Sequence, residues 1–182
     1  MMLRECVRLA REEQRIVIFV EPIALYPTRD LHREKDGIWM QRYPPVNERI
    51  PLGDVGVHGD GTDLAIITYG NGRYLSTQAQ EDLETRGIRT RVIDMRWLAP
   101  LPAEAILTAS KGCKNVLIVD ECRSTGSQSE ALMTMFVEND INAIARHVAG
   151  DCFIATGPAY AASLPSKHSI ISAALALVAG DK

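Results

Sequence analysis

The chain has 182 residues, which is material for about one domain of ordinary size. It is 46% hydrophobic and 24% charged, the composition of a globular protein with one core. Twenty Lys and Arg against 23 Asp and Glu give a formal charge of −3, and a nucleic-acid binder needs a cationic surface instead. A membrane span needs about 20 apolar residues in a row. The best candidate, Ile170–Ala179, is shorter, so we expect neither nucleic acid nor membrane as a partner.

The first thirty residues predict an incomplete helix–strand unit. Leu3, Cys6, Val7 and Ala10 have the spacing of a helix that buries one stripe. The apolar run Ile16–Val20 is typical of a buried strand. Charged residues continue through this opening, which excludes a secretory signal. Because no sheet partner for the strand is apparent, we expect residues 1–30 to be a piece of another domain or to dock onto one.

Residues 31–62 predict a linker between domains. The apolar period disappears between Tyr26 and Asp63, and prolines and glycines are frequent there. Unstructured connections of more than about 12–15 residues are uncommon inside a compact domain. We therefore expect this segment to lie on a surface, anchored by Trp39 and Tyr43.

Residues 63–182 show a regular alternation of strands and helices. The expected elements are a strand Leu64–Tyr69, a turn Gly70–Gly72, a helix with Leu75, Ala79 and Leu83 on one face that ends at Gly87, a strand Thr90–Leu98, and a helix Ala103–Ser110. After these we expect a buried parallel strand at Val116–Val119, a helix that buries Leu132, Met133, Phe136 and Val137, a strand Ile141–Val148, and a last helix capped by Ser166. This order predicts a three-layer α/β fold, a mostly parallel open sheet with helices on both faces.

Two glycine-containing strings offer cofactor interpretations. Gly70-Asn71-Gly72 lies between a strand and a helix, where backbone N–H groups can hold a phosphate. A dinucleotide fingerprint needs a third glycine where Leu75 stands, and the predicted strand continues past Asp94, so a tight turn is favoured over a nucleotide-binding module. The string 58–63, His-Gly-Asp-Gly-Thr-Asp, lies in the predicted linker and is interpreted as a turn rather than as a metal or diphosphate–Mg²⁺ site.

The four cysteines, Cys6, Cys113, Cys122 and Cys152, are scattered without a CxxC pair and indicate reduced thiols of an intracellular protein. Cys122 lies between a strand and a helix N-terminus, and His147 ends the next strand. A Cys–His nucleophile pair, as in a small hydrolase, is therefore an alternative. Buried structural cysteines are more common than reactive ones.

The loop that follows the buried strand is the most informative segment. Its polar residues are Glu121, Arg123, Thr125, Gly126 and Ser127. In open α/β sheets, function gathers at the carboxyl ends of strands, so this loop suits either a subunit contact or an anion. In the simplest alternative Ser127 caps the next helix, in a capping box with Glu130, and Glu121 pairs with Arg123.

The strings VIFVEPIALY, IPLGDVGV, DLAIITYGNG, GIRTRVIDMRWLAPLP, NVLIVDECRSTGSQSE and GPAYAASLP resemble the β subunit of thiamine diphosphate-dependent 2-oxoacid dehydrogenases, the pyruvate and branched-chain family. The most specific parts are Val92–Leu101 and Val119–Glu130. By this resemblance, residues 1–30 are the terminal helix and strand of a pyrimidine-binding domain, and residues 63–182 are a transketolase-type C-terminal domain. The long linker favours the form in which α and β parts are fused.

The resemblance also implies where the chemistry belongs. In such enzymes the thiamine diphosphate and Mg²⁺ lie between other domains, so no catalytic, cofactor-binding or metal-binding residue is carried over to this chain, and neither group is expected to bind it. Glu21 and Tyr26 would lie at the edge of the active site. Some members carry an aspartate for docking the lipoyl acyltransferase where this chain has Asn142.

We therefore expect a non-catalytic assembly domain of a parent enzyme that decarboxylates a 2-oxo acid oxidatively and transfers the acyl group to lipoamide. Its expected partners are the pyrimidine- and diphosphate-binding domains of the dehydrogenase, a second β-type unit and the lipoyl acyltransferase. The expected location is the cytoplasm of a bacterium rather than the mitochondrial matrix. A transketolase or a deoxyxylulose phosphate synthase has the same C-terminal domain and is the nearest alternative.

Overall fold

The computed structural model describes residues 1–180 and contains one five-stranded sheet in the order β1-β3-β2-β4-β5. The strands are β1 Gly56–His58, β2 Leu64–Thr68, β3 Thr90–Asp94, β4 Asn115–Arg123 and β5 Ile144–Ala149. Strand β1 runs antiparallel to β3, and the other three pairings are parallel. The predicted mostly parallel open sheet is confirmed.

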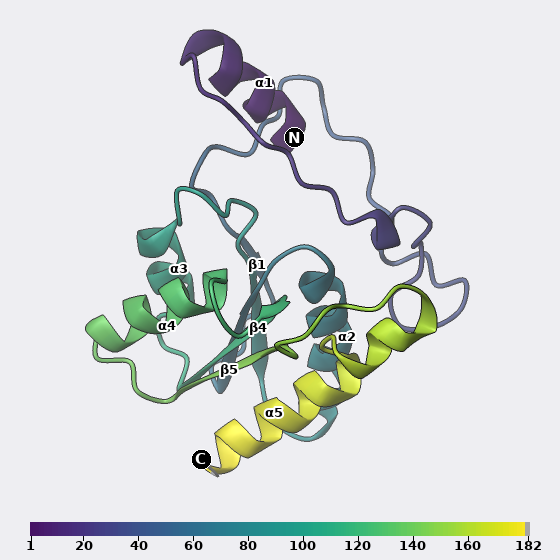
Figure 1. Cartoon of the computed structure of the whole chain (residues 1–182), viewed down its shortest axis with the longest axis vertical. Helices are drawn as coiled ribbons and strands as arrows, with labels where there is room; N and C mark the ends of the chain where they lie inside the picture. Colours follow the sequence, from purple (N-terminus) through teal and green to yellow (C-terminus); the bar gives the residue numbers. More distant parts are fainter. Residues whose placement is uncertain (181–182) are drawn as a thin grey trace.

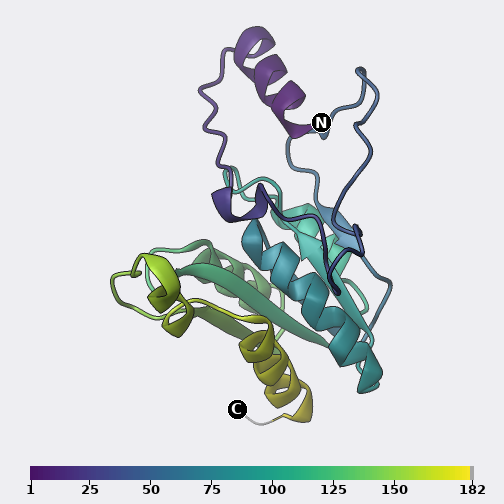
Figure 2. The ribbon, with the colours of Figure 1, turned by 90° about the vertical axis from the view of Figure 1, so that its right-hand side faces the viewer.

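Helices cover both faces of this sheet (Figures 1 and 2). On one face α2 (Asn71–Thr85) and α5 (Lys167–Ala179) pack against each other and on the sheet. On the other face lie α3 (Ala103–Ser110) and α4 (Gln128–Glu138). Each face has its own hydrophobic core, because the alternate side chains of one strand point to opposite faces. The predicted three-layer α/β fold is confirmed.

The apolar strands explain why two cores can form. In β2, Leu64 and Ile66 belong to the core under α2 and α5, whereas Ala65 and Ile67 belong to the core under α3 and α4. All of these side chains are fully buried. Strand β2 is the middle strand of the five, with β4 beside it. The apolar run Val116–Val119 in β4 is buried on both faces in the same way, as predicted.

The ends of α2 and α5 follow the expected signals. Helix α2 begins at Asn71 directly after Gly70, so the predicted turn Gly70–Gly72 is already the start of the helix. A Cβ on Gly72 would lie 2.2 Å from the Thr68 Oγ1, and this close approach needs glycine. Helix α5 opens with a capping box in which Ser166 and Ser169 each accept from the other's backbone N–H.

Strand boundaries and one core position in this region differ from the sequence prediction. Strand β3 ends at Asp94 rather than at Leu98, since Arg96 has a positive φ of 53° that an extended strand does not admit. Strand β5 begins at Ile144 rather than at residue 141. In α4, Val137 is 51% exposed and Met135 takes its expected place in the core.

The N-terminal helix α1 (Met2–Glu12) lies apart from the sheet, at the opposite end of the molecule from the chain's C-terminal helix (Figure 1). Of the four residues of its predicted stripe only Cys6 is buried, whereas Leu3, Val7 and Ala10 are exposed. Cys6 and Leu9 pack with Trp97 in a third, small core, whereas Leu3 and Val7 are 58% and 44% exposed. This third core, with Met2, Val17 and Leu52 around it, is the attachment of α1 to the sheet domain.

The strand predicted at Ile16–Val20 is not formed. The segment is extended but irregular, and Ile16, Ile18 and Val20 are 97%, 85% and 72% exposed. Within residues 1–180 its backbone N–H and C=O groups make no hydrogen bond. A strand requires a neighbour to bond to, and the described part of the chain supplies none here.

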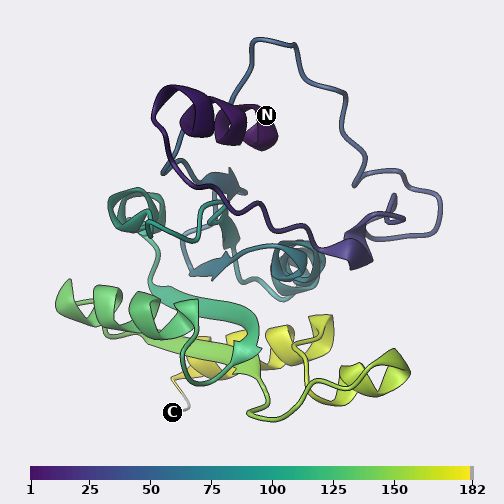
Figure 3. The same cartoon turned by 45° about the horizontal axis from the view of Figure 1, so that its top comes forward.

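The predicted linker at 31–62 is partly structured. Residues 56–58 form strand β1, and a short 3₁₀ helix, η1 (Ile23–Leu25), precedes the segment. Trp39 packs against Tyr74 of α2 as an anchor. Tyr43 is 86% exposed, and its ring meets the Arg4 guanidinium of α1 at 5.4 Å from the ring centroid. The later part of the linker, with Pro44, Pro45 and Glu48, runs as a wide irregular loop beside α1 (Figure 3).

Within the described residues, one segment, Gly157–Ala179, is long and apolar enough to cross a membrane by length and composition. In the fold it is two elements, the 3₁₀ helix η2 (Gly157–Ala162) and α5, separated by an irregular stretch. The 13 residues of α5 span about 20 Å, less than the roughly 30 Å of a hydrocarbon core. Its residues Ile170, Ile171 and Ala174 pack into the sheet core.

Candidate interface site at the carboxyl ends of the strands

The order of the strands places a topological switch point between β2 and β4. From β2 the chain crosses to β3 on one side, whereas β4 lies on the other side of β2. Such a switch point leaves the loops after the two strands facing each other, and in open α/β sheets this is where function gathers. Here the two loops are Gly70–Gly72 and Glu121–Ser127, so the loop singled out from the sequence lies at the switch point.

A hydrogen bond joins the two loops. The Asn71 side-chain amide donates to Glu121 Oε1 at 2.7 Å. Burial of the Glu121 carboxyl raises its pKa, and the Asn71 hydrogen bond opposes that rise. The expected pair between Glu121 and Arg123 is not formed, since Asn71 takes the carboxylate instead.

The Asp120 carboxylate fixes the start of the loop through three hydrogen bonds. Its carboxylate is 1% exposed and accepts hydrogen bonds from the Tyr69 hydroxyl at 2.6 Å, the Cys122 N–H at 2.8 Å and the Ser129 N–H at 3.1 Å. Burial and the hydrogen bond to Asp120 raise the pKa of Tyr69. This role of Asp120 was not predicted from the sequence. The available signal was an acidic residue at the end of a fully apolar strand, shortly before a helix N-terminus.

The predicted capping box of α4 is also replaced by other bonds. Ser127 is the N-cap residue, but its hydroxyl pairs with the Ser129 hydroxyl at 2.7 Å, and Glu130 Oε2 accepts from the Gly126 N–H at 2.6 Å. The carboxylates of Asp120 and Glu130 therefore already occupy the N-terminal end of the helix, where an external anion would bind. This favours the contact interpretation of the loop over the anion interpretation.

Arg123, Thr125 and Gly126 form the outward side of the loop and are exposed. The Arg146 guanidinium donates to the Ser124 carbonyl at 2.8 Å and holds the loop against β5. The loop is thus fixed on its inner side. Within residues 1–180 the Arg123 guanidinium and the Thr125 hydroxyl point outward without a side-chain hydrogen-bond partner. This arrangement suits polar contact with another protein surface.

Cys122 and His147 are not a nucleophile pair. Cys122 has the Tyr69 hydroxyl 3.6 Å from its Sγ, and the His147 ring nitrogen Nε2 hydrogen-bonds to the Ser169 hydroxyl at 2.8 Å. His147 lies beside Val119 in the sheet, three residues before Cys122. Burial lowers the pKa of His147. The two side chains have separate partners, so the Cys–His hydrogen bond that the hydrolase alternative requires is not formed.

The two glycine-containing strings are occupied by structural contacts. Asp94 lies 3.8 Å from the guanidiniums of both Arg73 and Arg96 and is not free for a ribose. Asp63 pairs with Lys114 at 2.8 Å and Arg89 at 3.4 Å. Across residues 1–180 no group of three or more His, Cys, Asp or Glu side chains is placed to hold a metal ion.

The remaining predicted residues lie away from the switch point. The Tyr26 hydroxyl donates to the exposed Glu21 carboxylate, which raises the pKa of Tyr26. Both belong to the N-terminal segment. Asn142 is exposed just before β5, at the amino end of the strands, and donates to the Asp140 carbonyl at 3.3 Å. The structure therefore does not bring Glu21, Tyr26 or Asn142 together with the loop.

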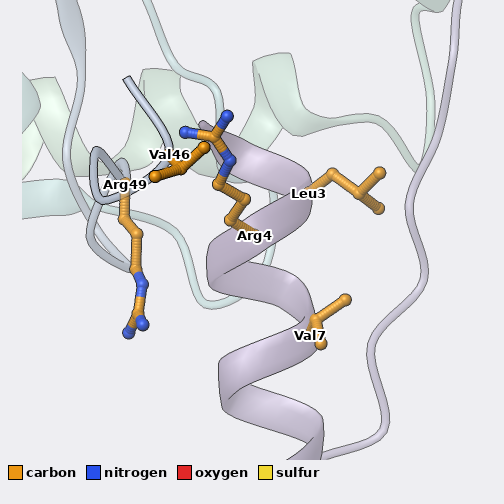
Figure 4. A pocket seen from close by; sticks show the side chains of 5 residues that line it. All are labelled: Leu3, Arg4, Val7, Val46 and Arg49. Carbon is orange, nitrogen blue, oxygen red and sulfur yellow. The ribbon is translucent and has the colours of Figure 1, made fainter. Parts of the chain in front are cut away.

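A separate hollow of about 330 Å³ lies against α1, lined by Leu3, Arg4, Val7, Val46 and Arg49 (Figure 4). Arg4 closes one side, since its guanidinium donates to the carbonyls of Pro44, Pro45 and Glu48. The lining contains guanidiniums and aliphatic groups but no acid, base or nucleophile. It has the character of a surface between packed segments rather than of a catalytic centre.

These features define an open α/β domain whose carboxyl edge carries a polar loop held by internal hydrogen bonds. Residues 53–170 match the model of the transketolase C-terminal domain, and the chain belongs to this family. The matched region begins three residues before β1, so the family domain includes the antiparallel strand that the sequence had assigned to the linker.

Curated relatives specify the resemblance further. The chain is 35% identical over 104 residues to the 2-oxoisovalerate dehydrogenase subunit beta of Bacillus subtilis, covering 56% of this chain and 32% of the relative. It is 32% identical over 107 residues to the pyruvate dehydrogenase E1 component subunit beta of the same organism, covering 59% and 30%. It is also 33% identical over 134 residues to the 1-deoxy-D-xylulose-5-phosphate synthase of Halothermothrix orenii, covering 71% and 21%. The predicted resemblance to dehydrogenase β subunits is confirmed, and the chain spans a third or less of the length of these relatives.

A solved structure described as a split-gene transketolase in an inactive β4 tetramer has the same fold, with a TM-score of 0.67 and 19% identity. The likeness covers 78% of this chain and 47% of that chain. At this identity it supports the fold alone.

Proposed function

We propose that this chain is the C-terminal assembly domain of a thiamine diphosphate-dependent 2-oxoacid dehydrogenase of the β-subunit type. The observation that carries the proposal is the family match together with similarity to the β subunits of two 2-oxoacid dehydrogenases. The parent reaction is oxidative decarboxylation of a 2-oxo acid with acyl transfer to lipoamide. Thiamine diphosphate and Mg²⁺ belong to other domains of the parent, in the cytoplasm of a bacterium.

The role proposed for the chain itself is contact rather than catalysis. The buried carboxylate of Asp120 is used by three internal donors, and Glu121 is bonded to Asn71. What the loop presents outward is Arg123 and Thr125, which suit a second β-type unit or the lipoyl acyltransferase. Interfaces commonly enrich arginine for this purpose.

The N-terminal unit supports the same role. Ile16, Ile18 and Val20 expose apolar side chains on a segment with an unbonded backbone, which is the chemistry of a strand that lacks its neighbours. In the proposed enzyme the pyrimidine-binding domain supplies those neighbours, and Glu21 and Tyr26 then lie at the edge of the active site. Residues 1–30 are thus proposed as the part of the chain closest to the chemistry.

The activity is tested on the chain combined with polypeptides that supply the pyrimidine- and diphosphate-binding domains. With thiamine diphosphate and Mg²⁺, we expect the assembly to decarboxylate a 2-oxo acid and acylate a lipoyl acceptor. Turnover of phosphosugars instead of 2-oxo acids would assign the chain to a transketolase or a deoxyxylulose phosphate synthase. Either that result or inactivity with all 2-oxo acids contradicts the proposed reaction.

The contact role has its own test. Calorimetry of the chain alone with thiamine diphosphate and Mg²⁺ should show no binding, whereas micromolar binding would contradict the proposal. In the assembly, Arg123→Glu should lower the assembled fraction seen by sedimentation without lowering the melting temperature. Lys111→Glu, at an exposed turn after α3, is the matched charge reversal and should leave assembly unchanged.

A further inference from the structure

The stretch Arg15–Glu21, which we name the unpaired segment, leaves its backbone open to a neighbour. Within residues 1–180 its one main-chain hydrogen bond runs from the Arg15 N–H to the Leu9 carbonyl, at 3.2 Å. Gln14 has a positive φ of 56° and Pro22 has no N–H, so these two residues bound the segment. Figure 2 shows the segment at the outer edge of the molecule, between α1 and η1.

The two faces of the unpaired segment have different surroundings. Val17 packs against the small core that attaches α1. Ile16, Ile18 and Val20 alternate with it and are exposed. Because Val17 makes its contact through a side chain, the neighbouring N–H and C=O groups stay available. An exposed backbone that carries β-branched residues is a template for pairing with a strand of another chain.

The sequence of the unpaired segment, Arg-Ile-Val-Ile-Phe-Val-Glu, is complementary to itself in one register. When two copies run antiparallel with their Ile18 residues opposite each other, Arg15 of each copy lies opposite Glu21 of the other. All positions between these ends are apolar. Opposite charges and pairs of β-branched or aromatic side chains are the cross-strand neighbours that stabilise a sheet. A second copy of this chain therefore matches the segment along its whole length.

Other arrangements of the same two segments lose this match. A parallel pairing in register places Arg15 beside Arg15 and Glu21 beside Glu21, and like charges in such positions are destabilising. An antiparallel pairing shifted by two residues sets Arg15 opposite Phe19, or else Glu21 opposite Val17. A shift by one residue moves the side chains to the wrong face. The charges at the two ends thus specify the register.

Both charged ends are available to a partner. The Arg15 side chain is 49% exposed, and its bond to Glu13 uses Nε, at 2.9 Å, so the terminal nitrogens remain. Glu21 is exposed and accepts the Tyr26 hydroxyl at Oε2, so Oε1 remains. Neither contact within the chain has to break before Arg15 meets the Glu21 carboxylate of a second copy.

We propose that the unpaired segment is a self-association edge, through which two copies of this chain form a two-fold symmetric dimer centred on Ile18. The bonded edge is that of Ile16, Ile18 and Val20, because the Arg15 N–H on the other edge is already used by Leu9. Two-fold dimers are the commonest oligomers. The inference does not depend on the proposed enzymatic function. In the proposed assembly, the pyrimidine-binding domain competes for the same edge.

Sedimentation equilibrium of the whole chain, from about 10 μM to about 1 mM, measures the dimer. We expect the average mass to rise with concentration from that of one chain toward that of two. Ile18→Lys sets two ammonium groups side by side on the symmetry axis and should leave the chain monomeric. Ile23→Lys adds the same charge at an exposed isoleucine outside the segment and should preserve the dimer. A native chain that stays monomeric over this range would overturn the proposal.

Charge reversal tests the register. Arg15→Glu and Glu21→Arg each place like charges opposite each other at both ends of the ribbon, and each should weaken dimerisation about 5-fold or more. The double variant Arg15→Glu/Glu21→Arg restores opposite charges and should return the dissociation constant to within about twofold of the native value. A double variant as weak as the single ones would overturn the antiparallel pairing.

Amide hydrogen exchange identifies the bonded edge. The N–H groups of Ile16, Ile18 and Val20 donate across the proposed ribbon, whereas those of Val17 and Phe19 point to the other edge. At about 100 times the dissociation constant, mass action leaves roughly a tenth of the chains or fewer as monomers. Exchange of the first three amides should then be about 10-fold slower than in dilute solution, with the other two unchanged. A dimer that protects neither set, or both equally, would overturn the proposed interface.

Discussion

Asp120 places a buried negative charge at the point where a strand, a loop and a helix meet. Three donors share its two oxygens, and one of them is the Ser129 N–H in the first turn of α4. The carboxylate therefore caps the N-terminus of α4 although it lies outside that helix. As an anion it also interacts favourably with the helix dipole. Loop 121–127 is held in place as a consequence.

Asp120→Asn should destabilise the chain by about 2–4 kcal/mol, because hydrogen bonds to a buried charged group are replaced by weaker or mismatched ones. Urea unfolding followed by circular dichroism measures the change. Asp151→Asn, at an exposed position, is the matched control and should change stability by less than about 0.5 kcal/mol. Equal effects of the two substitutions would contradict the role given to Asp120.

The lowered pKa of Asp63 predicts that part of the folding stability is lost at acid pH. The Lys114 ammonium and the Arg89 backbone N–H lower the pKa of this carboxyl to about 2, against about 3.9 in an unfolded chain. A lowered folded-state pKa contributes stability that is complete above the unfolded value and is lost as pH falls toward 2.

The unfolding midpoint of the native chain should therefore fall between pH 4 and 2 more steeply than that of Asp63→Asn. Measuring urea midpoints of both proteins across this range isolates the Asp63 contribution, since the other carboxyls titrate in both. Parallel curves would show that the ion pairs of Asp63 do not contribute to stability.

At the scale of the elements, Gly61 lies just before β2 and packs directly against the backbone at the start of β3. A Cβ there would lie 2.3 Å from the Arg89 carbonyl carbon and the Thr90 nitrogen, which are backbone atoms that cannot move aside alone. Gly61→Ala should therefore separate the segment before β2 from β3 and destabilise the chain by about 2 kcal/mol or more. Gly150→Ala, whose Cβ would meet only ordinary contacts from 3.5 Å, serves as the control in thermal unfolding.

The elements also show which parts of the fold are encoded locally. Residues 63–180 alternate between apolar runs and helical stripes, and each predicted strand and helix there is found, because burial on both faces leaves a continuous apolar run such as Val116–Val119. The boundary errors come from backbone conformation, as at Arg96, which the hydrophobic period does not encode.

The position of the candidate site could be predicted from the sequence, but its hydrogen bonds could not. A loop after a buried strand marks the carboxyl edge from sequence alone, and loop 121–127 lies there. The partners inside it depend on distances across the sheet. Asn71 reaches Glu121 over 50 residues of sequence, and Asp120 reaches past its own loop to Ser129. No local pattern distinguishes these bonds from the predicted capping box.

At the scale of the whole molecule, α1 is attached through its own small core. Leu9 is 2% exposed and packs with Cys6 and Trp97, outside both sheet cores. Leu9→Ala should weaken this attachment by about 2–4 kcal/mol and speed amide exchange in α1 while exchange in β2 and β4 is unchanged. Leu3→Ala, at a 58% exposed position on the same helix, should have little effect. Faster exchange throughout the sheet would mean that α1 and the sheet unfold together.

The strand predicted at Ile16–Val20 belongs to this scale as well. Its sequence has the apolar content of an internal strand, but a strand is a property of a sheet and not of a segment. The strand prediction was wrong for the described chain. The apolar residues indicate a buried environment, but a strand forms only where another strand is present to bond to its backbone, and residues 1–180 supply none here. The same residues are the ones proposed above to meet the pyrimidine-binding domain.

The chain has two tryptophans, and both lie where the N-terminal region is attached: Trp39 against Tyr74 of α2 and Trp97 beside α1. Neither belongs to the cores under the sheet. Indole emission is therefore an intrinsic gauge of undocking, whereas ellipticity in the far ultraviolet follows the helices and strands themselves. A titration read by both signals would separate the loosening of the first fifty residues from melting of the α/β body, without any label being introduced.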